Sequence, residues 1–364
     1  MNQRTFLIIA ISIFLILSCN FMNKKDKLYE YNVGPSAARG YVAQIISGSY
    51  LGNAIIPSSG AMRASWGMSS VVVVAGDGKY PVPDTISIYF YSYVEDQFYQ
   101  AVRPLPKDYL TELLEASYPD TKNRTLSYYD FTVSVAPCGW VSVWLGGSAG
   151  SLEICSFRAE KIELDYEKVF PQRNVSREEA RQIFFKGMFS FIQKEITENK
   201  VSSEYWENLS KKYKWKLSVN DPEFEVYDYM VNMINIERRY YASNGNWLTD
   251  LNEKSIPVKI VFYLKHDKDP LRYKVRLILA ESWDPEDNDK EKQTIRQMSR
   301  NRELMKIFED FYAEAGDEEV NLFVEFDNAM QSAQVKLKTA TKERIIEGCR
   351  IEGIFDSDRY MIDD

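Results

Sequence analysis

The chain of 364 residues holds one histidine, four cysteines and no excess of basic side chains. Any Ser-His-Asp triad would depend on His266 alone, and no Gly-x-Ser-x-Gly motif lies near it, so we read it as a solvated hairpin-turn residue. Lys and Arg number 45 against 53 acidic residues, a formal net charge of −8. Because nucleic-acid affinity comes from basic side chains that neutralise phosphates, this balance excludes a nucleic-acid partner.

Cysteine is scarce and odd in number once Cys19 is set aside, since Cys138, Cys155 and Cys349 remain. Their spacing matches no zinc motif and no second histidine supplies a ligand, so we expect no metal and no cofactor. Three interpretations stay open: buried structural thiols, a Cys138–Cys155 disulfide, or a redox-active thiol. We predict that Cys138 and Cys155 are not bonded, because Cys155 should lie opposite about Val141, several residues from Cys138.

Long hydrophobic runs are limited to the N-terminus, where Phe6 to Leu17 is apolar apart from Ser12 and follows Arg4. Twelve residues are too few to cross a bilayer as a helix, which needs about 20, so the run reads as a secretory signal. The sequence at 16–19 (ILSC) resembles a bacterial lipobox. That resemblance implies cleavage before Cys19, which would carry diacylglycerol and hold the protein on a bilayer.

The residues after Cys19 favour one destination in the cell envelope. Residues 20–27 are polar without apolar periodicity and read as a tether. Asn20 at the second mature position is compatible with transfer to the outer membrane. No acidic run follows, which favours the periplasmic face.

Apolar periodicity predicts an α+β fold with two mostly antiparallel sheet-plus-helix halves. We expect domains at 1–18 (signal peptide), 19–30 (lipidated cysteine and tether), 31–170 (N-terminal α+β domain), 171–246 (helical connecting region) and 247–364 (C-terminal α+β domain). The predicted strands are 41–46, 65–75, 85–93, 130–136, 140–145, 152–164, 256–264, 272–279, 321–326, 333–339 and 348–355. The order of elements in the two halves leaves two interpretations, a weak internal duplication and a coincidence of common architecture.

Three segments are predicted as helices, at 107–117, 176–200 and 290–315. The second is the clearest, because Ser176 and Glu179 form a capping box ahead of an apolar stripe from Ala180 to Ile192. Between residues 203 and 246 the sequence is aromatic and charged, and we expect helical pieces that join the halves.

Several stretches of the first half, at 83–99, 105–108, 136–147 and 153–159, are similar to the bacterial lipoproteins grouped as domain of unknown function 2931. The resemblance covers residues 41–165 well and the remainder loosely. It implies a membrane-anchored α+β protein. The family has no assigned activity, so no catalytic residue is carried over.

Exposed aromatic side chains are the candidate binding face, because flat rings dock partners or stack on sugars with little loss of side-chain entropy. Alternation places candidate residues on shared faces of two predicted strands: Tyr89, Tyr91 and Tyr93, and Trp140 and Trp144. The other interpretation is a second buried layer under the helix that begins at Ser176. Buried tryptophans are the outcome we expect.

Acidic residues offer weaker candidates. Glu95 and Asp96 could form a glycosidase pair, but adjacent acids at a strand-to-helix transition are better explained as helix N-terminal residues. Asp284, Glu286 and Asn288 have calcium-loop spacing, yet position six lacks glycine and position twelve lacks glutamate. Asp356, Asp358, Asp363 and Asp364 read as a frayed acidic terminus.

These observations lead to two functional hypotheses. The first is a noncatalytic envelope lipoprotein that binds a protein partner, with an immunity-type role against a basic toxin as one form of it. The second is a carbohydrate-binding or carbohydrate-active envelope protein. No catalytic constellation is found, so we expect no enzyme, and the expected partners are the bilayer through Cys19 and an envelope protein or glycan.

Overall fold

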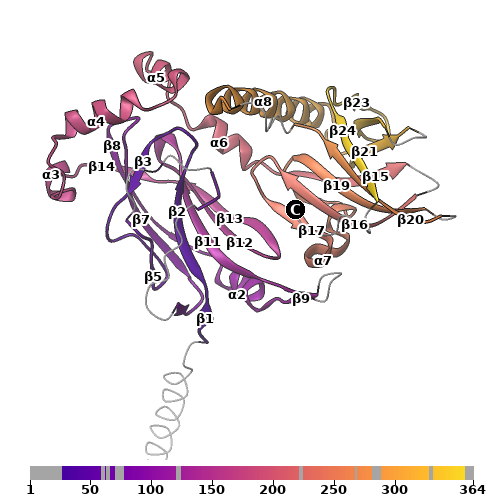
Figure 1. The fold of residues 1–364 in the computed structure, drawn as a ribbon, viewed down its shortest axis with the longest axis horizontal. Coiled ribbons are helices and arrows are strands. Elements are labelled where there is room, and N and C mark those ends of the chain that lie inside the picture. Colours follow the sequence, from indigo (N-terminus) through magenta and orange to yellow (C-terminus); the bar gives the residue numbers. More distant parts are fainter. Residues whose placement is uncertain are drawn as a thin grey trace, which may run out of the picture.

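The computed structural model describes residues 27–58, 62, 66–69, 78–119, 124–220, 224–266, 269–280, 288–327 and 331–356. Two sheet-rich halves lie side by side, with helices along one edge of both (Figure 1). The predicted α+β class is confirmed. The α-helices among the described residues are α2 (Lys107–Glu115), α3 (Tyr166–Val169), α4 (Arg177–Lys186), α5 (Ser190–Thr197), α6 (Glu204–Leu209), α7 (Tyr241–Asn244) and α8 (Lys290–Ala315).

The N-terminal half is a sandwich of two sheets. One sheet runs β2-β11-β12-β13, and the other runs β14-β8-β7-β4-β5 with β3 also paired to β7. Their main strands are β2 (Asn32–Ala37), β3 (Ala43–Ile45), β4 (Tyr50–Leu51), β5 (Ala54–Ile55), β7 (Thr85–Ser92), β8 (Gln97–Pro104), β11 (Tyr128–Val135), β12 (Trp140–Gly147), β13 (Gly150–Arg158) and β14 (Glu160–Ile162). Ile88 and Phe90 of β7 share one buried core with Val141 and Val143 of β12, so these side chains fill the space between the sheets.

The C-terminal half repeats this plan. Its main strands are β15 (Tyr213–Asn220), β16 (Phe224–Met233), β17 (Arg238–Tyr240), β18 (Asn252–Lys254), β19 (Pro257–His266), β20 (Asp269–Ile278), β21 (Val320–Phe326), β22 (Ala333–Lys338), β23 (Glu343–Ile345) and β24 (Arg350–Asp356). One sheet runs β18-β15-β21-β22-β23, and β16-β19-β20-β24 forms the second. Helix α8 precedes β21 as α2 precedes β11.

Strand pairing favours the duplication over coincidence. Each half opens with a strand that pairs in parallel with the strand beyond its long helix, β2 with β11 and β15 with β21. Each half closes with a strand that pairs antiparallel with the second strand of its central hairpin, β14 with β8 and β24 with β20. Parallel pairs are the minority in such sheets, so the same placement in both halves favours a common plan.

The halves are joined through the sheet itself. β13 pairs with β17 at Gly150↔Arg239 and Ser151↔Arg238, and β17 pairs with β16. One nine-stranded sheet, β2-β11-β12-β13-β17-β16-β19-β20-β24, therefore crosses the molecule. A buried apolar cluster also contains residues of both halves, among them Trp144, Trp206 and Leu304.

Two expectations about elements were wrong. The predicted helix 176–200 is two helices that break at Gly187, although its capping box is present. The segment 203–246 is helical only in short pieces and contributes strands β15, β16 and β17. In β15 the alternation of Tyr213, Trp215 and Leu217 with lysines and serine is a strand pattern, and burial of Trp215 and Leu217 satisfies it.

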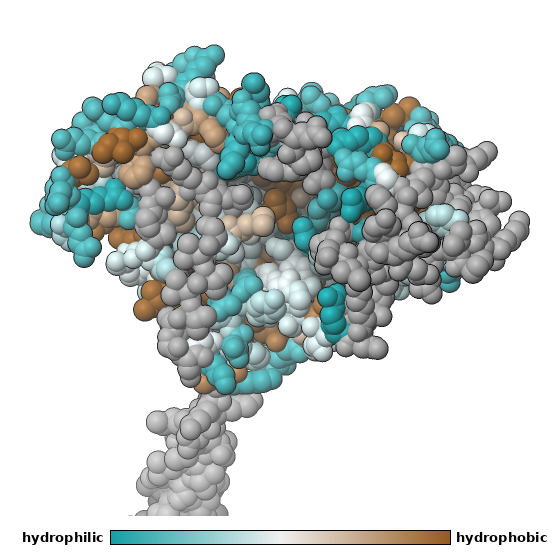
Figure 2. All heavy atoms as spheres, in the orientation of Figure 1, coloured by the Kyte–Doolittle hydropathy of each residue, from teal (hydrophilic) through white to brown (hydrophobic). Residues whose placement is uncertain are grey.

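Other predicted segments fare differently. Helix α8 has the predicted bounds, and its residue Ile295 is 44% exposed. Strands β2 and β8 were not predicted. The predicted strand 65–75 lies mostly outside the described residues, as do Cys19 and the tether to residue 26. On the face shown in Figure 2 the upper helices are mainly hydrophilic, with hydrophobic residues in separate small patches.

Candidate functional site

The predicted aromatic binding face does not exist as one exposed surface. Tyr89 and Tyr91 belong to β7, with Tyr93 just beyond, whereas Trp140 and Trp144 belong to β12 of the other sheet. The inward faces of both strands fill the core between the sheets, so the two aromatic sets occupy the opposite, outer faces of the sandwich. Strand alternation, correctly read from the sequence, could not show that these strands lie in different sheets.

Most of these rings are buried, and the tyrosine and tryptophan rings are covered by different neighbours. Tyr93 packs against Phe184 of α4 with ring centroids 4.3 Å apart, and Tyr91 packs edge-on against Tyr166 of α3. Tyr91 and Tyr93 thus form a buried layer under α3 and α4, whereas the layer expected under the helix that begins at Ser176 was that of Trp140 and Trp144. Trp144 is 1% exposed and lies edge-on to Trp66, and Trp140 and Tyr89 are partly buried.

Glu95 and Asp96 occupy a tight turn between β7 and β8, not a strand-to-helix transition. Glu95 accepts hydrogen bonds from Ser92, Tyr99 and the backbone N–H of Cys138. The Asp96 carboxylate pairs with Arg177 at 2.7 Å and accepts from the hydroxyl of Tyr91. Both carboxylates therefore hold a turn and a helix in place, which accounts for these acids without catalysis.

The three described cysteines are free thiols, and Cys138 and Cys155 are not bonded. Cys155 pairs in register with Val143 rather than Val141, because the turn between the strands is at Ser148 and Ala149 and because β13 bulges at Ile154. Burial raises the pKa of Cys138 and Cys349 to about 11 and that of Cys155 to about 12. Such thiols stay protonated at neutral pH and are poor nucleophiles.

The remaining sequence candidates make no site in the described part of the chain. His266 is the last residue of strand β19 rather than part of a turn, and its backbone lies opposite that of Asp269 in β20. The candidates outside the described residues are Asp284, Glu286, Asp358, Asp363 and Asp364, whereas Asn288 and Asp356 lie within them. Among described residues, no three His, Cys, Asp or Glu side chains are close enough to hold a metal ion. No described helix has the length and apolar character needed to cross a bilayer.

A cleft of about 480 Å³ opens where the N-terminal half meets α8, and we call it the junction cleft. Tyr41 and Trp206 are buried there, edge-on to one another with centroids 4.8 Å apart. Helix α8 contributes Met298 and Met305, and α6 contributes Tyr205. The charged residues at the cleft are Glu195, Lys200, Glu204, Arg302, Lys306 and Glu309.

Polar contacts fix the walls of the junction cleft. The hydroxyl of Tyr41 donates to Glu195 at 2.8 Å, and Asn301 donates to the hydroxyl of Tyr205 at 2.8 Å. Burial raises the pKa of Glu195 above its ordinary value and that of Tyr205 to about 12. The residues that line the cleft are therefore held in place before any ligand arrives.

Arg302 differs from its charged neighbours. Lys200 pairs with Glu198, and Lys306 with Asp310. The Arg302 guanidinium lies 5.2 Å from the centre of the Tyr205 ring, and it forms no ion pair with any residue in the described part of the chain. A guanidinium stacked on an aromatic ring keeps its donors available in the plane of the fork.

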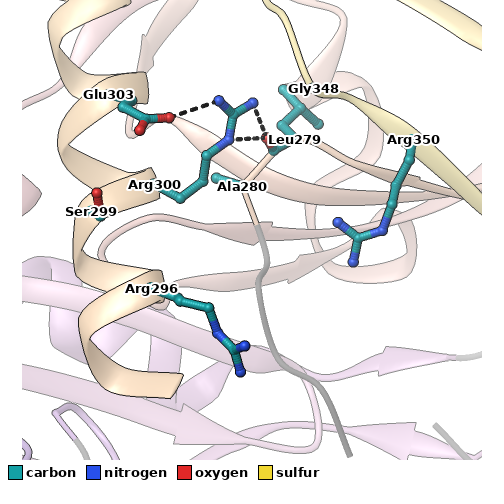
Figure 3. Close-up of a pocket in the computed structure, with 8 residues that line it drawn as sticks. All are labelled: Leu279, Ala280, Arg296, Ser299, Arg300, Glu303, Gly348 and Arg350. Carbon is teal, nitrogen blue, oxygen red and sulfur yellow. Dashed lines mark hydrogen bonds and ion pairs between the residues drawn. The ribbon is translucent and has the colours of Figure 1, made fainter. Parts of the chain in front are cut away.

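A second hollow of about 320 Å³ beside the same helix is lined by Arg296, Arg300 and Arg350 (Figure 3). Arg300 donates to the carbonyls of Leu279 and Glu347 and pairs with Glu303 at 3.1 Å. Its guanidinium thereby clamps α8 to the end of β20 and to the turn before β24. Arg350 pairs with Glu352 at 2.8 Å. At this hollow, arginine side chains therefore hold separate elements of the fold together.

Sequence reasoning missed the junction cleft entirely. Tyr41 and Tyr205 are 164 positions apart in the sequence, and α8 follows much later. The signal that could have pointed to it is Arg302, an arginine on a helix with no acidic residue three or four positions away. Only the fold shows that this side chain faces a distant aromatic cluster.

The first half of the chain matches a known protein family. Residues 18–196 match a family described as protein of unknown function (DUF2931), and through this segment the chain belongs to that family. The matched segment includes the whole first sandwich with α4 and most of α5. No curated protein and no solved structure matches the chain.

Proposed function

We propose that this protein is a noncatalytic envelope lipoprotein, anchored through Cys19 and facing the periplasm from the outer membrane, that binds a protein partner at the junction cleft. The lipobox-like segment supports the anchor. The cleft supports the binding role, because aromatic, methionine and arginine side chains surrounded by a polar rim are typical of protein interfaces.

The available guanidinium of Arg302 is the observation on which the proposal depends. Next to it, Tyr205 offers a rigid ring and Met298 and Met305 offer adaptable apolar surface. An aromatic or acidic anchor side chain of a partner fits this combination, since arginine and tyrosine are frequent binding hot spots. The formal net charge of −8 favours encounter with a basic partner, as an immunity-type role would require.

Capture from envelope extracts tests the proposal. Full-length protein and the variant Arg302→Glu would be compared with Lys161→Glu, an exposed lysine on β14 whose substitution changes the charge equally. We expect a captured protein to be lost with Arg302→Glu and retained with Lys161→Glu. Direct titration of the purified partner should show binding at least about tenfold weaker for Arg302→Glu, which corresponds to ~1.4 kcal/mol.

The opposite pattern would contradict the proposal. A partner that binds Arg302→Glu and wild type equally well uses another surface. Equal melting temperatures of both variants are required for the comparison, because a misfolded cleft would also fail to bind.

A further inference from the structure

A third hollow, separate from the junction cleft and from the arginine-lined hollow beside α8, lies over the seam where the sheets of the two halves meet. It encloses about 320 Å³ on one face of strands β11, β12, β13 and β17. We call it the seam groove. Its residues come from both halves, so it exists only because β13 pairs with β17.

Four residues in register form the floor of the seam groove. Asp130 pairs with Gly146, Gly146 with Ser151, and Ser151 with Arg238. A carboxylate, a gap without a side chain, a hydroxyl and a guanidinium therefore follow one another across four strands. With neighbouring strands about 4.8 Å apart, the row is ~14 Å long.

The polar groups of this row are largely available. Asp130 accepts one hydrogen bond from Asn32 at 2.7 Å, which leaves further acceptor capacity on its carboxylate. The side chains of Ser151, Arg238 and nearby Thr132 make no hydrogen bond or ion pair with any residue in the described ranges. Arg238 is exposed, and Asp130 and Ser151 are partly exposed, so solvent reaches the row.

Gly146 leaves space in the seam groove, although the backbone at this position does not require glycine. A Cβ atom there would lie 3.6 Å from the carbonyl oxygen of Asp130 and 3.8 Å from that of Gly150, which are ordinary contacts. At Gly147 and Gly150, by contrast, a Cβ would come within 2.3 Å of a backbone oxygen. A larger side chain at position 146 would therefore be tolerated by the fold and would fill the groove.

We propose that the seam groove binds a saccharide, with one pair of vicinal hydroxyls held by Asp130, a second pair on another ring held by Arg238, and further hydroxyls held by Ser151 and Thr132. A sugar hydroxyl both donates and accepts, so it can satisfy an acceptor, a hydroxyl and a donor placed along one row. Planar carboxylate and guanidinium groups each engage two neighbouring oxygens, which gives them geometric specificity. A chain of two or three sugar rings suits the elongated row better than a compact ion does.

Calorimetric titration of detergent-solubilised full-length protein tests this site, with cellotriose, chitotriose and trigalacturonate as probes. We expect one of these trisaccharides to bind. Gly146→Val should abolish binding while leaving the melting temperature unchanged, and Arg238→Gln should weaken it about tenfold. Arg103→Gln is the matched control, because it removes a partly exposed arginine from β8.

The outcomes separate this site from the junction cleft. Arg302→Glu should leave trisaccharide binding intact, whatever its effect on a protein partner. Failure of all three probes to bind wild type at millimolar concentration would overturn the proposal. So would undiminished binding by a normally folded Gly146→Val variant.

Discussion

Replacing Trp144 by alanine should destabilise the whole molecule. This side chain is 1% exposed, and it belongs to the apolar cluster that contains residues of both halves. Truncation of a buried tryptophan costs about 3 to 5 kcal/mol, and loss of the edge-on contact with Trp66 contributes ~0.5 to 1.5 kcal/mol.

One feature of Trp144 opposes this cost. Its indole N–H has no hydrogen-bond partner among the described residues, and an unpaired buried donor costs about 1 to 3 kcal/mol. Removal of the side chain also removes that cost, so we expect a net loss near 3 kcal/mol. The conservative change Trp144→Phe removes the same donor but keeps most of the ring, and it should cost ~1 kcal/mol or less.

Urea unfolding followed by circular dichroism would measure both variants, with Trp140→Ala as a control at a partly buried position on the same strand. A single transition is expected, because one sheet and one core connect the halves. A Trp144→Ala variant within about 1 kcal/mol of wild type would refute the argument that this face is a buried layer.

Three further predictions concern the anchor, the thiols and a buried lysine. Cys19→Ala should leave an uncleaved precursor or a soluble form, and unchanged acyl labelling with unchanged membrane fractionation would contradict lipidation. Iodoacetamide should modify Cys138, Cys155 and Cys349 slowly in the folded protein at pH 8 and rapidly in urea, and a linked Cys138–Cys155 peptide in a nonreducing digest would be incompatible with free thiols. Lys254 is 1% exposed, and burial lowers its pKa to about 7. The pKa of Lys254 in the unfolded state is near 10.4. Between the folded and the unfolded pKa the unfolded state therefore binds more protons than the folded state, so the free energy of unfolding should rise with pH, by at most ~1.4 kcal/mol per pH unit. Urea midpoints at pH 7 and pH 9 should differ in wild type and converge in Lys254→Met; equal dependence in both would exclude Lys254 as the cause.

Much of the fold could be predicted because its signals are local. The capping box at Ser176 and the bounds of α8 depend on residues within one or two helical turns. The alternation in β7 and β12 separates two faces of each strand, and both strands have this pattern in the structure. Family membership was also predictable, since the motifs that resemble the family lie in contiguous stretches.

The proposed binding surfaces could not be predicted, because they depend on which elements meet. Alternation showed that Tyr91 and Trp144 are each on one face of a strand, but only the pairing of strands placed them in different sheets. The seam groove depends on a two-residue pairing between β13 and β17, and the junction cleft on the approach of α8 to Tyr41. Sequence patterns alone predicted most of the local elements and the lipobox-like segment, because those signals span a few neighbouring residues. Which side chains are buried and which line a cleft is known only from the folded arrangement, because burial depends on contacts between segments far apart in the chain.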